Sequence, residues 1–564
     1  MGTLGEPAAA TARLEAGEAR RGRADAADAS RVPARRPLGL FALLAALAAW
    51  GGWLIWRTSL VIDGRRVFSL FDDAMISMTY ARNLLDGFGL NWARQGAPVE
   101  GFTHPLWLLL MLPANLPGLP LEWRSLPVQV MSLAFLAAGA VVAWRLVQRH
   151  FATPGLPDAS LALPAAALTA FYYPLAYWTV MGMEVALQAL LALVCVKLAL
   201  DAAFDGRERH GLLWAACTAA YLLRMDMLLL VVVVQAYLLF FGGVRAGSRR
   251  AWWIGAACFV AAVLGYELFR WVYFHDLLPN TYYLKLTGIP LAVRLRRGVA
   301  TFGDFAARHA LLLVVAAVVA VWRRRDRKLW LPLAVFAVFA AYEVWVGGDA
   351  WEDIGLRADR FLSFVMPLLF VLLNAGLNAA LARWVKWRGS RAVVAAEVTA
   401  VLWLLANGLA SPASARWNWL LMAGVERPPL VDRHGEVLSQ LASFERLVPS
   451  RATVGTAWAG IPAFFTDYRM VDVLGYNDRY LAHRPGPRPL VTERYWELIP
   501  GHTKWDVRYE LEQVRPDAFF QIWGVHTLGR VEMVMRSYGY RKRGHFWVRA
   551  DAPWMPAAGT RAGR

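Results

Sequence analysis

The stretch LGLFALLAALAAWGGWLIWRT, residues 38–58, decides the fold class. Its only charged residue is Arg57, and its length matches the roughly 20 apolar residues that a helix needs to cross a bilayer. Similar runs recur through the 564 residues, of which 58% are hydrophobic and 18% charged, whereas soluble proteins average about a quarter charged. The sequence therefore predicts a polytopic helical membrane protein and excludes a large soluble enzyme.

The segment before this stretch, residues 1–37, is rich in Ala, Arg and Glu, and its apolar residues show no period. That composition is typical of a disordered tail. Residues 38–58 are too long for the core of a signal peptide, and no small-residue cleavage site follows them. We therefore expect a retained first span with its Arg-rich N-terminus in the cytoplasm.

Basic loops predict how the other apolar runs are oriented, because Lys and Arg favour the cytoplasmic side. The net charge of +18 is thus interpreted as an orientation signal rather than as a nucleic-acid surface. The basic loops are residues 145–150, 207–210, 245–250, 322–328 and 383–391. Placing all of them inside predicts about eleven spans, the first at 38–58 and the others near 126–147, 161–180, 184–200, 212–223, 227–243, 252–274, 309–322, 330–346, 361–380 and 392–410.

An odd number of crossings places residues 411–564 outside the cytoplasm. This segment alternates β-like stretches with turns, at 452–458, 469–475 and 517–523, which predicts an extracytoplasmic α/β domain. Residues 38–410 would form the transmembrane module. Within it, residues 105–118 hold two internal prolines and are short for a span, so we interpret them as an interfacial or re-entrant helix.

The unusual polar residues gather in the loops that this topology places outside, at 59–104, 224–226, 275–308 and 347–360. Asp72 and Asp73 are the sharpest feature, because they open an amphipathic stretch with a helical period. A carboxylate there can cap the free N–H groups of the helix, or it can serve as a general base or metal-facing group. A cap needs only one Asp, so the second is free to face a cleft.

Other polar residues allow two interpretations each. Arg224 and Asp226 make a self-neutralising turn, or Arg224 binds an anionic head group. Lys285 either snorkels to the interface or holds phosphate. Glu184 is either an acid at a helix N-terminus or a substrate ligand.

In the tail segment, several polar residues line either a sugar-binding surface or ordinary solvated loops. They are Asp472, Asn477, Asp478, Arg479, His502, Lys504 and Asp506. His502 and His526 lack the close ligand spacing of a zinc site.

An ordered set of motifs resembles a family of bacterial GT-C glycosyltransferases whose best-known members are the terminal β-(1→2)-arabinofuranosyltransferases of actinobacterial cell walls. DDAMISMTYARNLLDGFGLNW (72–92) and VEGFTHPLW (99–107) are similar to the first external loop of that family. The other matches are MGMEVAL (181–187), LLRMDMLL (222–229), PNTYYLK (279–285), GGDAWEDIGLRADRF (347–361), DVLGYNDRYLAH (472–483) and GHTKWD (501–506). The chain departs from the family at His104 (Asn expected), Met225 (Pro) and Val185 (Thr).

The resemblance implies an enzyme of the bacterial inner membrane that moves a sugar, such as arabinofuranose, from a polyprenyl phosphate donor to a glycan, lipid or protein acceptor on the extracytoplasmic face. It also implies an acidic catalytic residue in the first external loop, here Asp72 or Asp73. We rank Glu100 after them as a candidate base. Arg224, Lys285 and Arg360 are the candidates for binding the donor phosphate. The remaining substrate-binding candidates are His104, Glu184, Asp226, Asn280, Asp349, Asp472, Asp478, Arg479, His502 and Lys504.

A divalent cation, Mg²⁺ or Mn²⁺, bridging Asp73 and the phosphate is compatible with the sequence but not required by it. The alternative function is a carrier or flippase of polyprenyl-phosphate-linked lipids. Transporters usually show internal repeats and polar residues near the midplane. The sequence has neither an evident repeat nor such a cluster, so we rank the enzyme first.

Overall fold

The computed structural model describes residues 38–152, 162–351, 359–384, 402–403, 407, 421–423, 426–428, 430–485 and 497–555. The predicted tail at 1–37 lies outside the described residues. So does the predicted span at 392–410, apart from residues 402–403 and 407.

Five helical segments of the described chain are long and apolar enough to cross a membrane, so the chain is a multi-pass membrane protein. They are Leu38–Thr58 (α2), Leu121–His150 (with α5, Ser125–His150), Val185–Asp205 (α8), Ala246–Phe274 (with α11, Arg249–Phe274) and Arg327–Val346 (with α15, Trp330–Val346). A sixth span is added if α13 (Leu291–Arg308) and α14 (Ala310–Trp322), which meet at 85°, are counted as one.

The other predicted crossings are shorter or interrupted helices. The third is split at Tyr172 into α6 (Leu163–Phe171) and α7 (Tyr173–Val180), because Pro174 in the first turn of α7 lacks the N–H that a continuous helix would bond to the carbonyl of Ala170. The fifth and sixth are α9 (His210–Leu223) and α10 (Leu228–Phe240), and the tenth is α17 (Met366–Trp384). The structure thus gives five or six full-length spans among the described residues and does not confirm the predicted count of eleven.

Residues 105–118 begin with α4 (Pro105–Met111), which continues into a 3-10 turn, Leu112–Asn115. At about 1.5 Å per residue this apolar segment extends only about 16 Å, too short to cross about 30 Å of hydrocarbon. It packs instead against α3 and α9.

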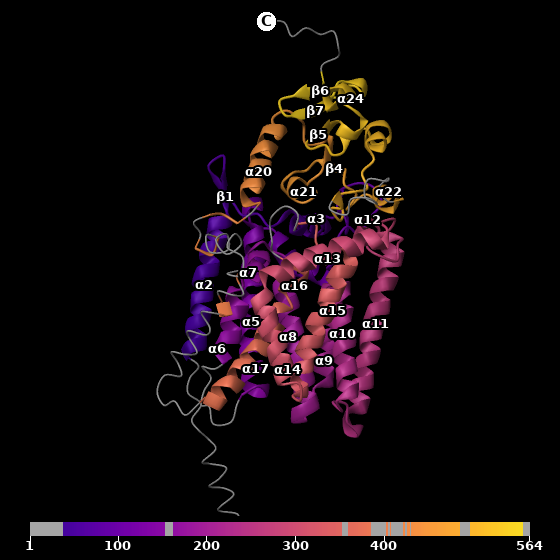
Figure 1. Ribbon diagram of the computed structural model, residues 1–564. Helices are drawn as coiled ribbons and strands as arrows, with labels where there is room; N and C mark the ends of the chain where they lie inside the picture. Colours follow the sequence, from indigo (N-terminus) through magenta and orange to yellow (C-terminus); the bar gives the residue numbers. More distant parts are fainter. Residues whose placement is uncertain are drawn as a thin grey trace, which may run out of the picture.

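The loop at 59–104 forms a hairpin and a helix. Strands β1 (Leu60–Ile62) and β2 (Arg65–Val67) pair antiparallel across Asp63 and Gly64, both with positive φ, as a type I′ turn requires. Helix α3 (Asp72–Leu85) follows. It lies at the same end of the bundle as α12 (Asn280–Leu286) and α16 (Arg360–Ser363), beneath the C-terminal domain (Figure 1).

The C-terminal domain contains a five-stranded sheet in the order β4-β3-β5-β7-β6. Its strands are β3 (Thr453–Thr456), β4 (Arg469–Asp472), β5 (Ala518–Phe519), β6 (Tyr540–Arg543) and β7 (Phe546–Arg549). β3 pairs in parallel with β4 and β5, while β7 pairs antiparallel with β5 and β6. The helices are α20 (Val431–Glu445), α21 (Ile461–Phe465), α22 (Arg479–His483) and α24 (Val531–Ser537).

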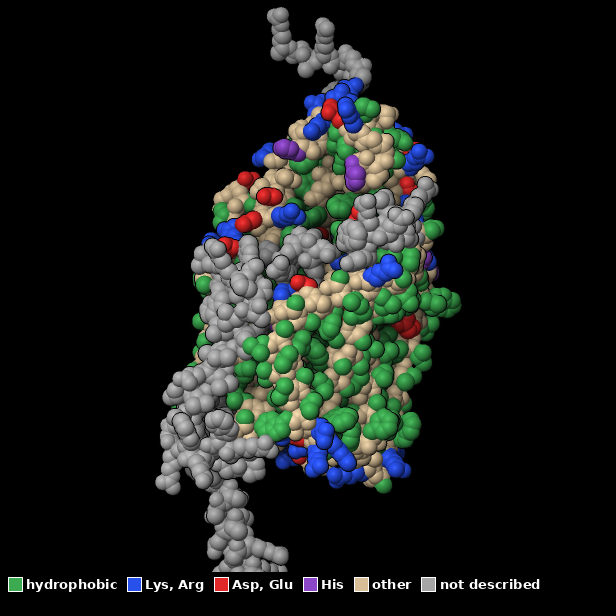
Figure 2. All heavy atoms as spheres, viewed as in Figure 1, with side chains coloured by type: hydrophobic (Ala, Val, Ile, Leu, Met, Phe, Trp, Pro, Cys, Tyr) green, Lys and Arg blue, Asp and Glu red, His purple; other side chains and the backbone are tan. Residues whose placement is uncertain are grey.

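The visible face of the molecule divides into zones (Figure 2). Hydrophobic side chains cover the helical region, and Lys and Arg gather at the end of the bundle away from the sheet. This is the distribution expected of a bundle whose middle lies in lipid. The pocket described below lies near the other boundary, where the bundle meets the sheet domain.

Candidate functional site

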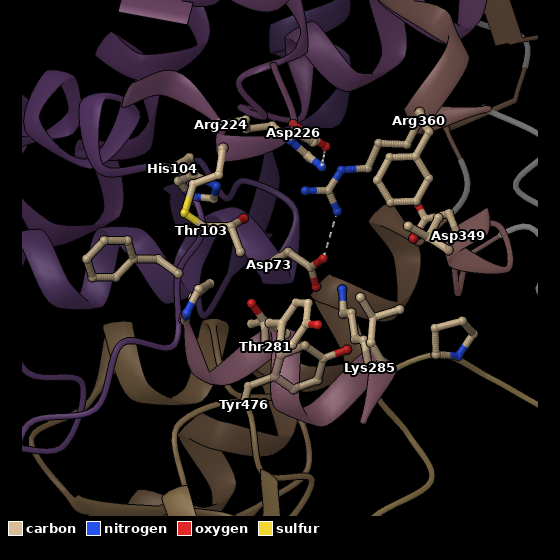
Figure 3. A pocket seen from close by; sticks show the side chains of 18 of the residues that line it. Asp73, Thr103, His104, Arg224, Asp226, Thr281, Lys285, Asp349, Arg360 and Tyr476 are labelled. Atoms are coloured by element: carbon tan, nitrogen blue, oxygen red, sulfur yellow. Dashed lines mark hydrogen bonds and ion pairs between the residues drawn. The ribbon is translucent and has the colours of Figure 1, made fainter. Parts of the chain in front are cut away.

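A cavity of about 170 Å³ lies where the helical bundle meets the C-terminal domain. Helices α3, α12, α15 and α16, the turn at 224–226 and residues 101–104 provide most of its wall, and Tyr476 and Pro500 come from the C-terminal domain. Its charged lining residues are Asp73, Arg224, Asp226, Lys285, Asp349 and Arg360 (Figure 3). Residues from loops far apart in the sequence therefore converge at one pocket.

Asp73 projects into this pocket from the first turn of α3. Its Oδ2 atom lies 3.0 Å from Nη1 of Arg360 and accepts a 3.4 Å hydrogen bond from the indole of Trp351. The side chain is 19% exposed, whereas that of its partner Arg360 is 8% exposed. A carboxylate that is held by one cation and still reachable can take a proton from a bound hydroxyl group.

Glu184 is not among the lining residues of the pocket but bridges its two arginines. It stands immediately before α8 and is fully buried. Its Oε1 atom lies 2.9 Å from Nη1 of Arg224 and 3.4 Å from Nη2 of Arg360. Arg224 also pairs with Asp226, at 2.5 and 3.1 Å. The arginines are therefore fixed by charged hydrogen bonds before any ligand binds.

His104 adds a neutral group to this network. Its Nε2 atom lies 2.6 Å from the hydroxyl oxygen of Ser77, and its Nδ1 atom lies 3.7 Å from Glu184. Burial lowers the pKa of His104 to about 4, so the imidazole is uncharged near neutral pH. Ser77 stands one helical turn after Asp73 and also lines the pocket.

Lys285 enters from α12 opposite Arg360. Its Nζ atom lies 5.4 Å from the ring centroid of Tyr476, and no described residue hydrogen-bonds to it. Burial lowers the pKa of Lys285, while the charges of Asp73 and Asp349 oppose that shift. A half-buried ammonium with unused donors is suited to a bound anion.

Asp349 is placed by α13. Arg297 of that helix donates hydrogen bonds to the backbone carbonyls of Gly347 and Asp349, the latter at 2.8 Å. Asp349 is 2% exposed, and one of its oxygens accepts from the N–H of Ala350 at 2.8 Å. Its other oxygen has no hydrogen-bond partner among the described residues.

Asp72 lies outside the pocket, although we ranked it equally with Asp73. Its two oxygens accept hydrogen bonds from the N–H groups of Ile461 and Gly460, at 2.7 and 3.2 Å, at the start of α21. The expected cap therefore exists, but on a helix of the C-terminal domain rather than on α3 itself. Asp72 joins the two domains and thereby helps to fix the helix that carries Asp73.

Substituting Asp72 by Asn should alter stability more than chemistry. Burial raises the pKa of Asp72 to about 7, against 3.8 for a free side chain. The folded protein thus retains this proton at pH values where the unfolded chain has lost it, so stability from this group falls as pH rises from about 4 to about 7. We expect Asp72→Asn to flatten that part of the pH profile of the thermal unfolding midpoint. An unchanged slope in the variant would contradict this assignment.

Glu100 and Asn280 also lie outside the pocket lining. Glu100 is 2% exposed and accepts hydrogen bonds from Arg270 and Tyr266, both at 2.6 Å. Asn280 donates from its side-chain amide to the carbonyls of Gly475 and Tyr476 in the C-terminal domain, at 2.9 Å each. Both side chains hold segments around the pocket in place.

Most of the polar candidates of the tail segment make contacts that order its loops. Asp472 accepts from the N–H groups of Leu474, Gly475 and Asn477, and burial raises its pKa to about 6. Asp478 accepts a hydrogen bond from the N–H of Leu481, and Arg479 donates one to the carbonyl of His275. Lys504 donates hydrogen bonds to Tyr283, Thr287 and Ala482.

His502 lies beside the pocket. Its ring centroid lies 6.2 Å from that of Trp351, the hydrogen-bond donor to Asp73, and 6.0 Å from that of Tyr476. Burial lowers its pKa.

The sequence patterns did not indicate several lining residues, among them Ser77, Thr281, Tyr342 and Tyr476, or Trp351, which donates a hydrogen bond to Asp73. Ser77 was open to inference, because position i+4 of a helix shares a face with Asp73. Tyr342 lies within an apolar run and Tyr476 belongs to a distant loop, so neither position carries a local pattern that indicates the pocket.

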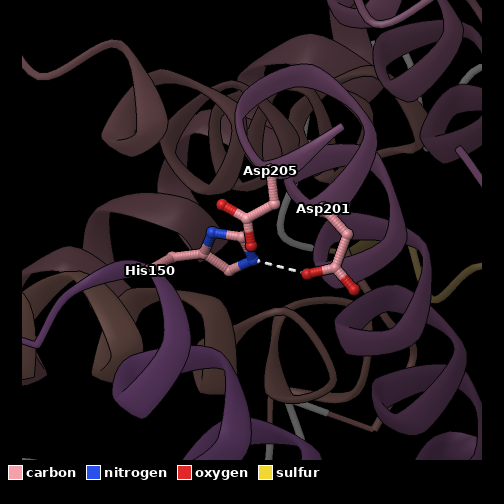
Figure 4. A group of neighbouring side chains, drawn as sticks. All are labelled: His150, Asp201 and Asp205. Atoms are coloured by element: carbon pink, nitrogen blue, oxygen red, sulfur yellow. Dashed lines mark hydrogen bonds and ion pairs between the residues drawn. The ribbon is translucent and has the colours of Figure 1, made fainter. Parts of the chain in front are cut away.

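A second group of potential metal ligands, His150, Asp201 and Asp205, lies elsewhere, where the ends of α5 and α8 meet (Figure 4). His150 Nε2 lies 2.8 Å from Asp201. Arg149 lies 2.7 Å from each of the two aspartates, and Lys197 lies 2.7 Å from Asp201. Two cations already neutralise the two carboxylates, so we interpret the group as an ion-pair network between helices.

Comparison with known proteins gives limited matches. A family model described as a domain of unknown function (DUF8728) matches residues 431–554, which contain the sheet domain. No curated protein matches the chain. Among solved structures, the chain is similar to ArnT from Cupriavidus metallidurans at 14% identity and a TM-score of 0.49. The match to ArnT bound to undecaprenyl phosphate covers 79% of this chain and 88% of that chain. The match to ArnT in the apo state covers 86% of this chain and 92% of that chain.

Proposed function

We propose that this protein is a membrane glycosyltransferase of the GT-C type, which moves a sugar from a polyprenyl phosphate donor to an acceptor hydroxyl. One observation carries the proposal. A reachable carboxylate, Asp73, shares a pocket with three cations, Arg224, Lys285 and Arg360, at the boundary of a membrane-spanning bundle. Such a pocket provides a base for the acceptor and positive charge for a lipid-linked phosphate.

In this proposal the phosphate binds between Arg360 and Lys285. Arg224 lies in the same network through Glu184 and adds a second guanidinium. Guanidinium groups suit phosphate oxygens because their N–H donors form a planar fork. When the bond between the sugar's anomeric carbon and the phosphate oxygen breaks, negative charge grows on the phosphate, and these cations stabilise it.

Asp73 is the proposed general base. It accepts the proton of the acceptor hydroxyl as that oxygen forms its bond to the anomeric carbon, and polyprenyl phosphate leaves with the electrons of the broken bond. Arg360 contacts Asp73 at 3.0 Å and also faces the proposed phosphate site. The same guanidinium can therefore keep the carboxylate beside the sugar and hold the leaving group.

The sugar and the acceptor rest on the sequence resemblance, which favours arabinofuranose and a component of the bacterial cell envelope. The same resemblance places the reaction on the extracytoplasmic face of the inner membrane, with the C-terminal domain on that side. Tyr476 and Pro500 of this domain line the pocket. We propose that the domain binds the acceptor while the bundle binds the donor lipid.

A divalent ion enters the proposal only in an assisting role. Asp73 and the Asp349 oxygen that has no hydrogen-bond partner in the described part of the chain are oxygen ligands of the kind that Mg²⁺ and Mn²⁺ accept, so these residues fit an ion that also contacts phosphate. The three cations already supply comparable charge. We therefore expect EDTA to lower transfer less than about threefold, whereas a complete loss restored by Mg²⁺ would make the ion essential.

The test uses purified protein in nanodiscs, a panel of polyprenyl-phosphate-linked sugars and a cell-wall glycan acceptor. We expect label from at least one donor to appear in the acceptor. If the protein bound a donor and moved it between the leaflets without transferring its sugar, the proposed function would be wrong and the carrier or flippase function would take its place.

A further inference from the structure

A basic groove lies at the end of the bundle away from the sheet domain. It has a volume of about 760 Å³ and lies between the end of α10 and the turn that joins α14 to α15. Lys and Arg side chains gather at this end of the molecule (Figure 2). The groove is lined by Phe240, Phe241, Arg324, Arg325, Arg327 and Trp330.

The turn that carries the arginines is held by hydrogen bonds to its backbone. The hydroxyl of Tyr237 donates to the carbonyl of Arg327 at 2.8 Å, and the indole of Trp330 donates to that of Arg324 at 3.1 Å. Arg323 pairs with Asp326 at 2.6 Å and neutralises the acid of the turn. The turn therefore has a defined shape.

Three arginines of this turn remain available to a ligand. Arg324 and Arg325 are exposed, and neither pairs with a carboxylate among the described residues. The guanidinium of Arg327 lies 5.7 Å from the ring centroid of Phe241, and it too has no carboxylate partner in that part of the chain. Three positive charges thus border one groove. Among the described residues, the only interaction that the structure gives the guanidinium of Arg327 is its cation–π contact with Phe241.

The surface beside the groove is apolar and exposed. Phe240 is 85% exposed and Trp330 55%, and on the neighbouring α14 Val318 and Val321 are 59% and 67% exposed. In a membrane-spanning bundle such side chains face acyl chains, and Trp concentrates where the hydrocarbon ends. The arginines therefore lie at the level of the lipid phosphates, next to an apolar surface that the acyl chains can contact.

We propose that this groove binds the headgroup of an anionic phospholipid, with its phosphate diester between the arginines and its acyl chains along Phe240 and α14. Basic pockets at the ends of membrane helices are suited to anionic headgroups, and guanidinium forks suit phosphate. A run of arginines that only oriented the chain would need the charge but neither a fixed turn nor an aromatic lining. The proposal does not depend on the transfer reaction.

The test is native mass spectrometry of the full-length protein in detergent, titrated with phosphatidylglycerol and with phosphatidylcholine of the same acyl chains. We expect phosphatidylglycerol to bind about tenfold more tightly. The double variant Arg324→Gln/Arg325→Gln should reduce that binding to the level of phosphatidylcholine. The single variant Arg325→Gln, at an exposed position, should weaken phosphatidylglycerol binding about threefold. It is used instead of the double variant if the double variant does not fold.

The matched control is Arg249→Gln/Arg250→Gln, which removes the same charge from two exposed arginines in the first turn of α11. It should leave phosphatidylglycerol binding unchanged. Equal losses in the two double variants, or equal binding of the two lipids by the unaltered protein, would overturn the proposal. Displacement of the lipid by millimolar inorganic phosphate would also overturn it, because the groove would then recognise phosphate without acyl chains.

Discussion

Asp73→Asn is expected to lower the turnover number for sugar transfer about 10³-fold while leaving donor binding nearly unchanged. Asparagine has the shape of aspartate and can still accept hydrogen bonds from Trp351 and Arg360, but it cannot take a proton from the acceptor. The measurement is the rate of label transfer at saturating donor, together with the donor's dissociation constant for the same sample.

Asp72→Asn is the control for this prediction, because it makes the same change at the neighbouring residue outside the pocket. It should retain transfer within about tenfold of the unaltered protein. Loss of transfer in Asp72→Asn with full activity in Asp73→Asn would exchange the two roles. Full transfer by both variants would show that neither Asp72 nor Asp73 is the catalytic base.

Glu184→Gln is expected to raise the KM for the lipid donor about 100-fold, with a smaller fall in kcat. Glu184 holds Arg224 and Arg360 at 2.9 and 3.4 Å from one oxygen atom. A neutral amide would leave the two guanidinium groups without their shared counter-charge, so they would repel each other and lose their alignment toward the phosphate. Initial rates over a range of donor concentrations separate the two parameters.

Glu100→Gln is the matched control, since Glu100 is an equally buried carboxylate paired with an arginine, Arg270, outside the pocket lining. It should lower the thermal unfolding midpoint but leave the donor KM within about threefold. A similar rise in KM for both variants would mean that loss of a buried ion pair loosens the whole bundle. In that case Glu184 would have no particular connection with the donor.

Periodicity and charge were sufficient to predict the helical membrane bundle and the gathering of polar residues at one end of it. The length of an apolar run and the charge of a short loop depend only on residues that are adjacent in sequence, so both can be assessed from the sequence alone. They failed where tertiary packing decides the outcome. Residues 161–180 look like one apolar span but break before Pro174. Residues 291–308, expected as part of an external loop, form the helix α13, which meets α14 at 85°.

The candidate site was predictable in its residue types but not in its pairings. Asp73, Arg224, Lys285, Asp349 and Arg360 were all proposed from their loops, and all line one pocket. The sequence could not tell Asp73 from Asp72, because the distinction depends on where Gly460 and Ile461 place two backbone N–H groups. Glu100 and Asn280 were also indistinguishable from pocket residues, since their partners are distant in sequence.

The central claim is that the pocket transfers a sugar from a lipid phosphate. Its most direct test is to quantify, in one reaction of the unaltered protein, the polyprenyl phosphate released and the sugar gained by the acceptor. Equal amounts of the two products are predicted, appearing at the same rate and both absent with Asp73→Asn. Release of polyprenyl phosphate with free sugar would instead indicate hydrolysis, and bound donor that stays intact for every sugar and acceptor offered would contradict the account.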